Sequence, residues 1–64
     1  MTDFAREVRR HLTKAGWRFE RHGKGDHERW VNPKTGAHVT VDSKIRSRHT
    51  ANGVLTEAGI GKKF

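Results

Sequence analysis

The sequence predicts an α+β fold in which a helix, three antiparallel strands and a second helix follow one another. Before Gly16, apolar residues recur with the period of 3.6 residues that is typical of a helix. From Trp17 to Val41 they alternate with period two, as in half-buried strands, and the helical pattern returns after Asp42. With 64 residues the chain has room for one small core, so we expect a single domain over residues 1–64.

The first helix is expected over residues 3–15, with Asp3 as its N-cap and Gly16 at its C-terminal end. Its apolar stripe consists of Met1, Phe4, Val8, Leu12 and Ala15. A ridge of three basic residues lies on the opposite side: Arg6, Arg10 and Lys14. This ridge is either a solvated helix face or a row of phosphate contacts.

Three strands are expected at residues 17–21, 26–31 and 37–41, joined by turns rich in glycine and, in the second turn, proline. Alternation assigns one face of the sheet to the core, with Trp17, Phe19, Trp30, Val39 and Val41. Two helices should cover this face and leave the other face open.

The second helix is expected at residues 50–58, with Ser47 or Thr50 as its cap. Its inward face is predicted to contain Val54, Leu55 and Ala58, with Ile45 and Ile60 at its ends. The segment before it, residues 42–49, lacks periodicity and is expected to be a basic loop. Its cations are Lys44, Arg46 and Arg48, for which we predict phosphate contacts.

The amino-acid composition limits the kinds of partner and site that the chain can have. Fourteen Lys and Arg stand against seven Asp and Glu, a net charge of +7 that favours a nucleic acid or an acidic partner. There is no cysteine, which excludes disulfides and thiolate metal sites, and the five histidines form no zinc pattern. No apolar run is long enough to span a membrane and no secretory signal is visible. We therefore expect a cytoplasmic protein without a metal or other cofactor.

One histidine has a setting that suggests chemistry. His27 follows a glycine-rich turn and shares the open face of the sheet with Arg29, with Lys24 nearby. An imidazole can move a proton, and adjacent cations can stabilise charge on the oxygens of a phosphodiester that is attacked by a 2′-hydroxyl. From the residues alone, however, an ordinary surface histidine is the simpler interpretation.

The chain resembles the HicA toxins of bacterial toxin–antitoxin systems in five ordered motifs. They are KAGW at residues 14–17, GDHERW at 25–30, NP at 32–33, VTV at 39–41 and VLTEAGI at 54–60. The resemblance implies a fold like that of double-stranded-RNA-binding domains, and a metal-independent endoribonuclease that cleaves mRNA and arrests growth. It also implies neutralisation by a HicB-like antitoxin; we expect a monomer when the protein is free.

By position, the resemblance assigns the catalytic role to His27 and a backbone role to Gly25, which precedes it by two residues. Asp26 replaces the usual serine, Glu28 replaces a frequent second histidine, and Arg29 replaces an aliphatic residue. A carboxylate from Asp26 beside His27 would favour the imidazolium form, which leaves open whether His27 acts as acid or base. Two alternatives stay open: a non-catalytic double-stranded-RNA-binding module, and a protein whose basic surface binds an acidic protein partner.

Overall fold

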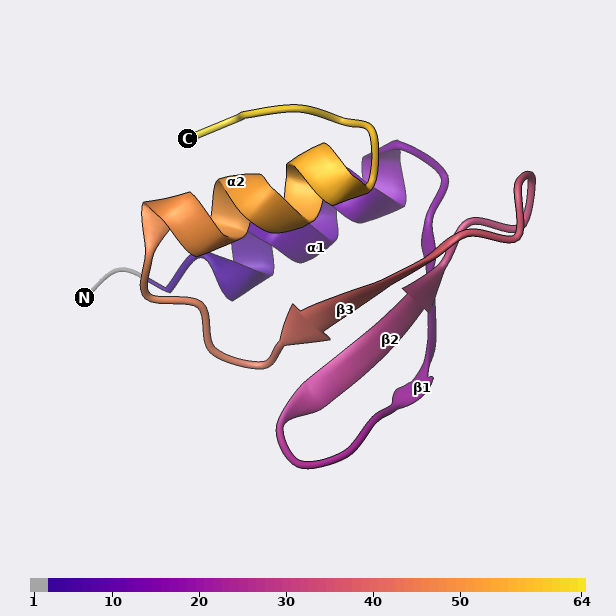
Figure 1. Ribbon diagram of the computed structural model, residues 1–64, viewed down its shortest axis with the longest axis horizontal. Helices are drawn as coiled ribbons and strands as arrows, with labels where there is room; N and C mark the ends of the chain where they lie inside the picture. The colour runs from indigo at the N-terminus through magenta and orange to yellow at the C-terminus, as the bar shows by residue number, and fades with distance from the viewer. Residues whose placement is uncertain (1–2) are drawn as a thin grey trace.

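The computed structural model describes residues 3–64 and contains five elements in the predicted order. They are α1 (Ala5–Lys14), β1 (Arg18–His22), β2 (His27–Val31), β3 (His38–Asp42) and α2 (Arg48–Glu57). The strands form one antiparallel sheet in the order β1-β2-β3. Both helices lie side by side over the same face of the sheet, and the other face is open (Figure 1). The predicted α-β-β-β-α fold is confirmed.

The core fills the space between the two helices and the covered face of the sheet. Its buried apolar residues are Ala5, Val8, Leu12, Trp17, Trp30, Val39, Val41, Ile45, Ala51 and Leu55. Most of the predicted core is therefore confirmed, including both tryptophans. Met1, which the helical pattern also includes, lies outside the described residues.

Phe19 is a correction, because its side chain was predicted to be buried and is 45% exposed. It is paired with Trp30 across the strands, and the two rings lie 6.1 Å apart. However, β1 is an edge strand whose five residues are all exposed, so the helices do not complete the burial of Phe19. Ala15 is also exposed, at the C-cap of α1, and Ala5 is buried in the first turn of that helix.

The start of α1 is tied to the loop that follows β3. Phe4 rather than Asp3 occupies the N-cap position. The Oδ1 atom of Asp3 nevertheless accepts hydrogen bonds from the backbone N–H groups of Ala5 (3.0 Å) and Ile45 (3.2 Å). These two bonds stabilise the carboxylate and lower the pKa of Asp3. One side chain thus accepts a hydrogen bond from the first turn of α1 and another from the loop after β3, which holds the two segments together.

The second helix begins two residues earlier than predicted. Ser47 is its N-cap, and the hydroxyl of Ser47 accepts a hydrogen bond from the backbone N–H of Thr50 at 3.3 Å. Arg48 and His49 therefore belong to the first turn of α2 and not to the basic loop. The loop itself is shorter than expected and covers residues 43–47.

The C-terminal tail folds back across the two helices (Figure 1). Asn52 of α2 holds it, since the Oδ1 atom of Asn52 accepts hydrogen bonds from the backbone N–H groups of Lys63 (3.2 Å) and Phe64 (3.1 Å). The ring of Phe64 packs edge-on against Phe4 and His11, with centroid distances of 5.0 and 5.8 Å. The tail therefore extends the packing between α1 and α2.

Candidate active site

His27 is the first residue of β2, and its side chain is 52% exposed. The backbone around it is held by the residues that directly follow β1 and β3. The carbonyl of His27 accepts a hydrogen bond from Gly23 N (2.7 Å), and the carbonyl of Asp26 accepts one from Ser43 N (2.7 Å). An accessible imidazole is thus attached to a backbone that hydrogen bonds hold in place, as a catalytic side chain requires.

The carboxylate in contact with His27 belongs to Asp42, a residue that the sequence argument did not place in the site. His27 and Asp42 lie directly opposite each other in the β2–β3 ladder. The Nδ1 atom of His27 is 2.6 Å from Oδ1 of Asp42 in an ion pair. No such pair joins Asp26 to His27 within residues 3–64, so the chain neighbour is not the contacting acid.

The register of the hairpin could have identified Asp42. If the turn covers residues 32–37, Val31 lies opposite His38, and counting back along both strands places His27 opposite Asp42. The prediction ended the third strand at Val41, one residue too early. The predicted strand, which ends at Val41, therefore leaves Asp42 outside the sheet.

An open pocket lies beside His27 and is lined by residues 24–27 and 42–44. Lys24 comes from the β1–β2 turn and Lys44 from the loop after β3, so the two lysines bring positive charge to the pocket from two segments. Arg46 and Arg48, which were predicted to act with Lys44, are exposed but are not among the lining residues. We call this depression the His27 pocket.

A second open pocket shares Lys24 and His27 with the first and continues along the open face of the sheet past Arg29 and Thr40. The two depressions together form a path on which His27 lies at the junction. An extended chain with a charged backbone could follow this path past the imidazole. Such a shape is compatible with a single-stranded polyanion.

Arg29 is on the open face, as predicted, but its charge is already balanced. Its Nε atom lies 3.2 Å from Oε1 of Glu20, and Oε2 of the same carboxylate lies 3.6 Å from Nε2 of His38. A guanidinium paired with a carboxylate has less charge available for a phosphate. Lys24 and Lys44 are therefore better candidates than Arg29 for contacting a phosphate at His27.

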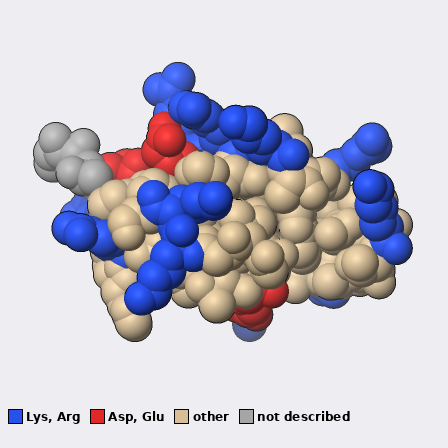
Figure 2. Space-filling view, turned by 90° about the horizontal axis from the view of Figure 1, so that it is seen from above, with Lys and Arg blue, Asp and Glu red and all other residues tan. Residues whose placement is uncertain are grey.

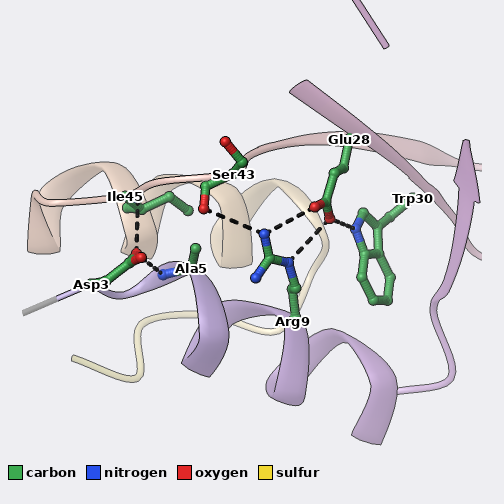
Figure 3. Close-up of polar contacts among 7 residues, drawn as sticks. All are labelled: Asp3, Ala5, Arg9, Glu28, Trp30, Ser43 and Ile45. Atoms are coloured by element: carbon green, nitrogen blue, oxygen red, sulfur yellow. Dashed lines mark hydrogen bonds and ion pairs between the residues drawn. The ribbon is translucent and has the colours of Figure 1, made fainter. Parts of the chain in front are cut away.

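On the covered side of the sheet, β2 is anchored to α1 by Glu28 (Figure 3). Arg9 donates hydrogen bonds to both carboxylate oxygens of Glu28, from Nε at 3.1 Å and from Nη2 at 2.9 Å. Trp30 Nε1 donates a further hydrogen bond to Oε1 of Glu28 at 3.1 Å, and Arg9 Nη2 also reaches the carbonyl of Ser43 at 3.4 Å. One guanidinium thus contacts β2 and the residue that follows β3, next to the His27–Asp42 pair.

The electrostatics of Glu28 follow from this network. Burial raises the pKa of Glu28, but the hydrogen bonds from Arg9 and Trp30 and the positive charge of Arg9 outweigh it and hold the pKa below its ordinary value. Glu28 is therefore an ionised structural residue beneath the site. Arg9 and its role in the network were missed by the sequence argument, which assigned no function to that residue.

Gly25 supplies the backbone conformation that brings the chain into β2. Its φ of +68° lies in the left-handed region, and a Cβ placed there would meet no atom within 4 Å. Glycine is therefore required here for its backbone conformation, and not because neighbouring atoms leave no space for a side chain.

Positive charge is distributed over the surface. Seen from the helix side, Lys and Arg side chains form several separate groups, with few acidic residues between them (Figure 2). Within residues 3–64, no three side chains of His, Cys, Asp or Glu come together in a set that could hold a metal ion. Neither helix in the described part of the chain has the length and apolar character needed to cross a membrane.

These features define a small basic domain with the α-β-β-β-α topology and a histidine–carboxylate pair at a lysine-flanked pocket. The family model described as the HicA toxin of bacterial toxin–antitoxin systems matches residues 5–60 of the 64-residue chain. The chain therefore belongs to the HicA toxin family. Comparisons with curated proteins and with solved structures gave no match.

Proposed function

We propose that this protein is a toxin that acts as a metal-independent endoribonuclease on mRNA, with His27 as its catalytic residue. The observation that carries the proposal is the exposed imidazole of His27, paired with a carboxylate at 2.6 Å in a pocket lined by Lys24 and Lys44. Membership of the HicA toxin family supports the role of toxin. The activity is assigned to the cytoplasm, where mRNA is available.

In the proposed reaction, the nucleophile is the 2′-hydroxyl of the RNA itself. His27 removes the proton from this hydroxyl, the 2′-oxygen bonds to the adjacent phosphorus, and the bond from phosphorus to the 5′-oxygen breaks. The protonated imidazole then returns the proton to the departing 5′-oxygen. Lys24 and Lys44 stabilise the negative charge that grows on the phosphoryl oxygens.

Binding of the RNA is assigned to the same basic residues and to Arg46 and Arg48 beside them. Phosphate contacts by Lys and Arg give affinity without requiring a particular base sequence. Arg46 and Arg48 are exposed and lie close in sequence to Lys44, which lines the pocket. They therefore extend the basic surface from the His27 pocket toward the N-terminus of α2.

We propose that the free toxin is a monomer and is neutralised by a HicB-like antitoxin that covers the His27 pocket. A partner with acidic side chains would match the net charge of +7 and associate rapidly. Co-expression with the protein encoded next to it should yield one complex that lacks ribonuclease activity. A chain that stays alone and harmless in cells would contradict this part of the proposal.

Cleavage of RNA by the purified protein in the presence of a chelator tests the main proposal. Wild-type protein should cut RNA, and a substrate with a 2′-deoxy nucleotide at the cut site should resist, because the internal nucleophile is absent. Binding without cleavage of either substrate would favour the non-catalytic RNA-binding module. Loss of activity with the chelator would contradict a metal-independent reaction.

A further inference from the structure

We propose that Asp42 is a positioning residue that holds the proton of His27 on Nδ1 and leaves Nε2 as the nitrogen that exchanges protons with the RNA. This inference rests on the proposed function and names a residue that acts through the catalytic imidazole. When the ring of His27 is neutral, this arrangement gives it the role of general base. The carboxylate that contacts His27 is therefore that of Asp42 and not that of Asp26, the neighbour of His27 in the chain.

The contact distance between His27 and Asp42 requires a proton between the two side chains. Two lone pairs do not approach to the 2.6 Å that separates His27 Nδ1 from Asp42 Oδ1, so a proton lies between these atoms. In a neutral imidazole, the nitrogen that carries the proton toward a carboxylate leaves the other ring nitrogen free to accept one. No hydrogen bond or ion pair of residues 3–64 engages Nε2 of His27.

The backbone of Asp42 is itself held in place. It lies opposite His27 in the β2–β3 ladder, and the next residue, Ser43, donates its backbone N–H to the carbonyl of Asp26 at 2.7 Å. The carbonyl of Ser43 accepts a hydrogen bond from Arg9 at 3.4 Å, which ties this point to α1. The backbones of the imidazole and of the carboxylate are thus fixed relative to each other.

A carboxylate at this position also fits the charge that forms on His27 during the proposed reaction. When Nε2 takes the proton from the 2′-hydroxyl, His27 becomes an imidazolium while the 2′-oxygen bonds to phosphorus. The ionised carboxylate of Asp42 stabilises this cation without accepting its proton, and the imidazolium then protonates the 5′-oxygen as its bond to phosphorus breaks. Lys24 and Lys44 in the same pocket disfavour a third positive charge on His27, and the carboxylate of Asp42 offsets this effect.

The proposal is tested with Asp42→Ala, Asp42→Asn and Asp42→Glu in the full-length chain, with Glu57→Gln as the control. Glu57→Gln removes one carboxylate from an exposed position at the end of α2 and changes the net charge by the same amount as Asp42→Asn. Because the Asp42 side chain is 44% exposed, the variants should fold, and thermal unfolding verifies this.

The first measurement is the tautomer of His27, read from the ¹⁵N chemical shifts of its ring in histidine-labelled protein at a pH where the ring is neutral. Wild-type protein should hold the proton on Nδ1. Asp42→Ala should move the proton toward Nε2, and the control should not. An unchanged tautomer in Asp42→Ala would overturn the proposal.

The second measurement is RNA cleavage. Asp42→Ala should lower kcat by at least about tenfold with little change in KM, a loss smaller than the about 10²–10⁴-fold expected when a general base itself is removed. Compared with Asp42→Ala, Asp42→Glu should recover part of kcat. Asp42→Asn should recover less, because only Glu restores the negative charge. Equal kcat in all variants would overturn the positioning role.

The two readouts separate this inference from the proposed function. If wild-type protein does not cleave RNA, the proposed function fails, and the positioning role in catalysis fails with it. The tautomer measurement in the free protein still decides whether Asp42 controls His27. If wild-type protein cleaves RNA but neither the tautomer of His27 nor kcat changes in the Asp42 variants, only the inference fails.

Discussion

Arg9 and Glu28 form a two-point ion pair that joins α1 to β2 on the side of the sheet opposite the candidate site. Glu28 is adjacent to His27 in the chain, and strand alternation directs the two side chains to opposite faces. The guanidinium of Arg9 also reaches Ser43, which follows Asp42. The position of the His27–Asp42 pair therefore depends on a polar network beneath the sheet (Figure 3).

Glu28→Gln should destabilise the protein, because it removes the charged acceptor of three hydrogen bonds at a side chain that is only 12% exposed. We expect the free energy of unfolding to fall by about 2–3 kcal/mol, the range for hydrogen bonds to charged groups at a largely buried pair. Urea denaturation measures this change. Glu57→Gln, at an exposed site, should change it by less than about 0.5 kcal/mol, and equal losses in the two variants would contradict the anchoring role.

Stability should decline as the pH falls into the acid range. The folded-state pKa of Glu28 lies below its ordinary value of 4.5, and that of Asp3 lies below 3.8. The stability that these carboxylates contribute is fully present above their ordinary values and is lost as the pH falls through the lowered values. Unfolding in urea from neutral pH downward measures the decline. Glu28→Gln should flatten the curve, and a curve of unchanged slope would contradict the assignment.

The lysines of the His27 pocket should contribute to the salt dependence of RNA binding. Removing one phosphate contact with a single strand should flatten log K against log salt by about 0.7, and with duplex DNA by about 0.9. We expect such a change for Lys24→Ala and Lys44→Ala, and a larger one when Lys44, Arg46 and Arg48 are replaced together. Lys34→Ala, in the turn at the other end of β2, is the control. An unchanged slope in the triple variant would exclude the basic segment from binding.

Gly25 and Gly53 should respond to alanine in opposite directions. Gly25→Ala forces a Cβ into the left-handed region at φ +68° and should cost about 1–2 kcal/mol. Gly53→Ala, inside α2 with no atom within 4 Å of the added carbon, should stabilise the fold by up to about 1 kcal/mol. Thermal unfolding compares them. A destabilised Gly53→Ala or an unaffected Gly25→Ala would contradict the backbone geometry.

The sequence predicted the elements well because each rests on a local pattern. The period of Val8 and Leu12 defines α1, and alternation through Trp30, Val39 and Val41 defines the covered face of the sheet. Phe19 was misassigned because alternation reports which face a residue occupies but not whether a helix extends over it. That depends on how two helices of ten residues each sit over three strands.

The candidate site was only partly predictable, for a related reason. His27, Gly25 and Lys24 belong to one continuous segment, so their proximity is visible in the sequence. Asp42 reaches His27 through strand register, and the prediction had ended the strand one residue short. Arg9 contributes from a helix 19 positions before Glu28, where no periodic pattern specifies a partner.

RNA cleavage by His27→Ala, compared with His38→Ala, tests the central claim most directly. Both histidines are exposed residues at the start of a strand and each contacts a carboxylate, but they lie at opposite ends of the β2–β3 hairpin. His27→Ala should stay folded, with a change in stability under about 1 kcal/mol, should still bind RNA, and should lose about 10²–10⁴-fold in cleavage rate. His38→Ala should cleave like the wild type. A folded His27→Ala protein that still degrades RNA and still arrests growth would contradict the account.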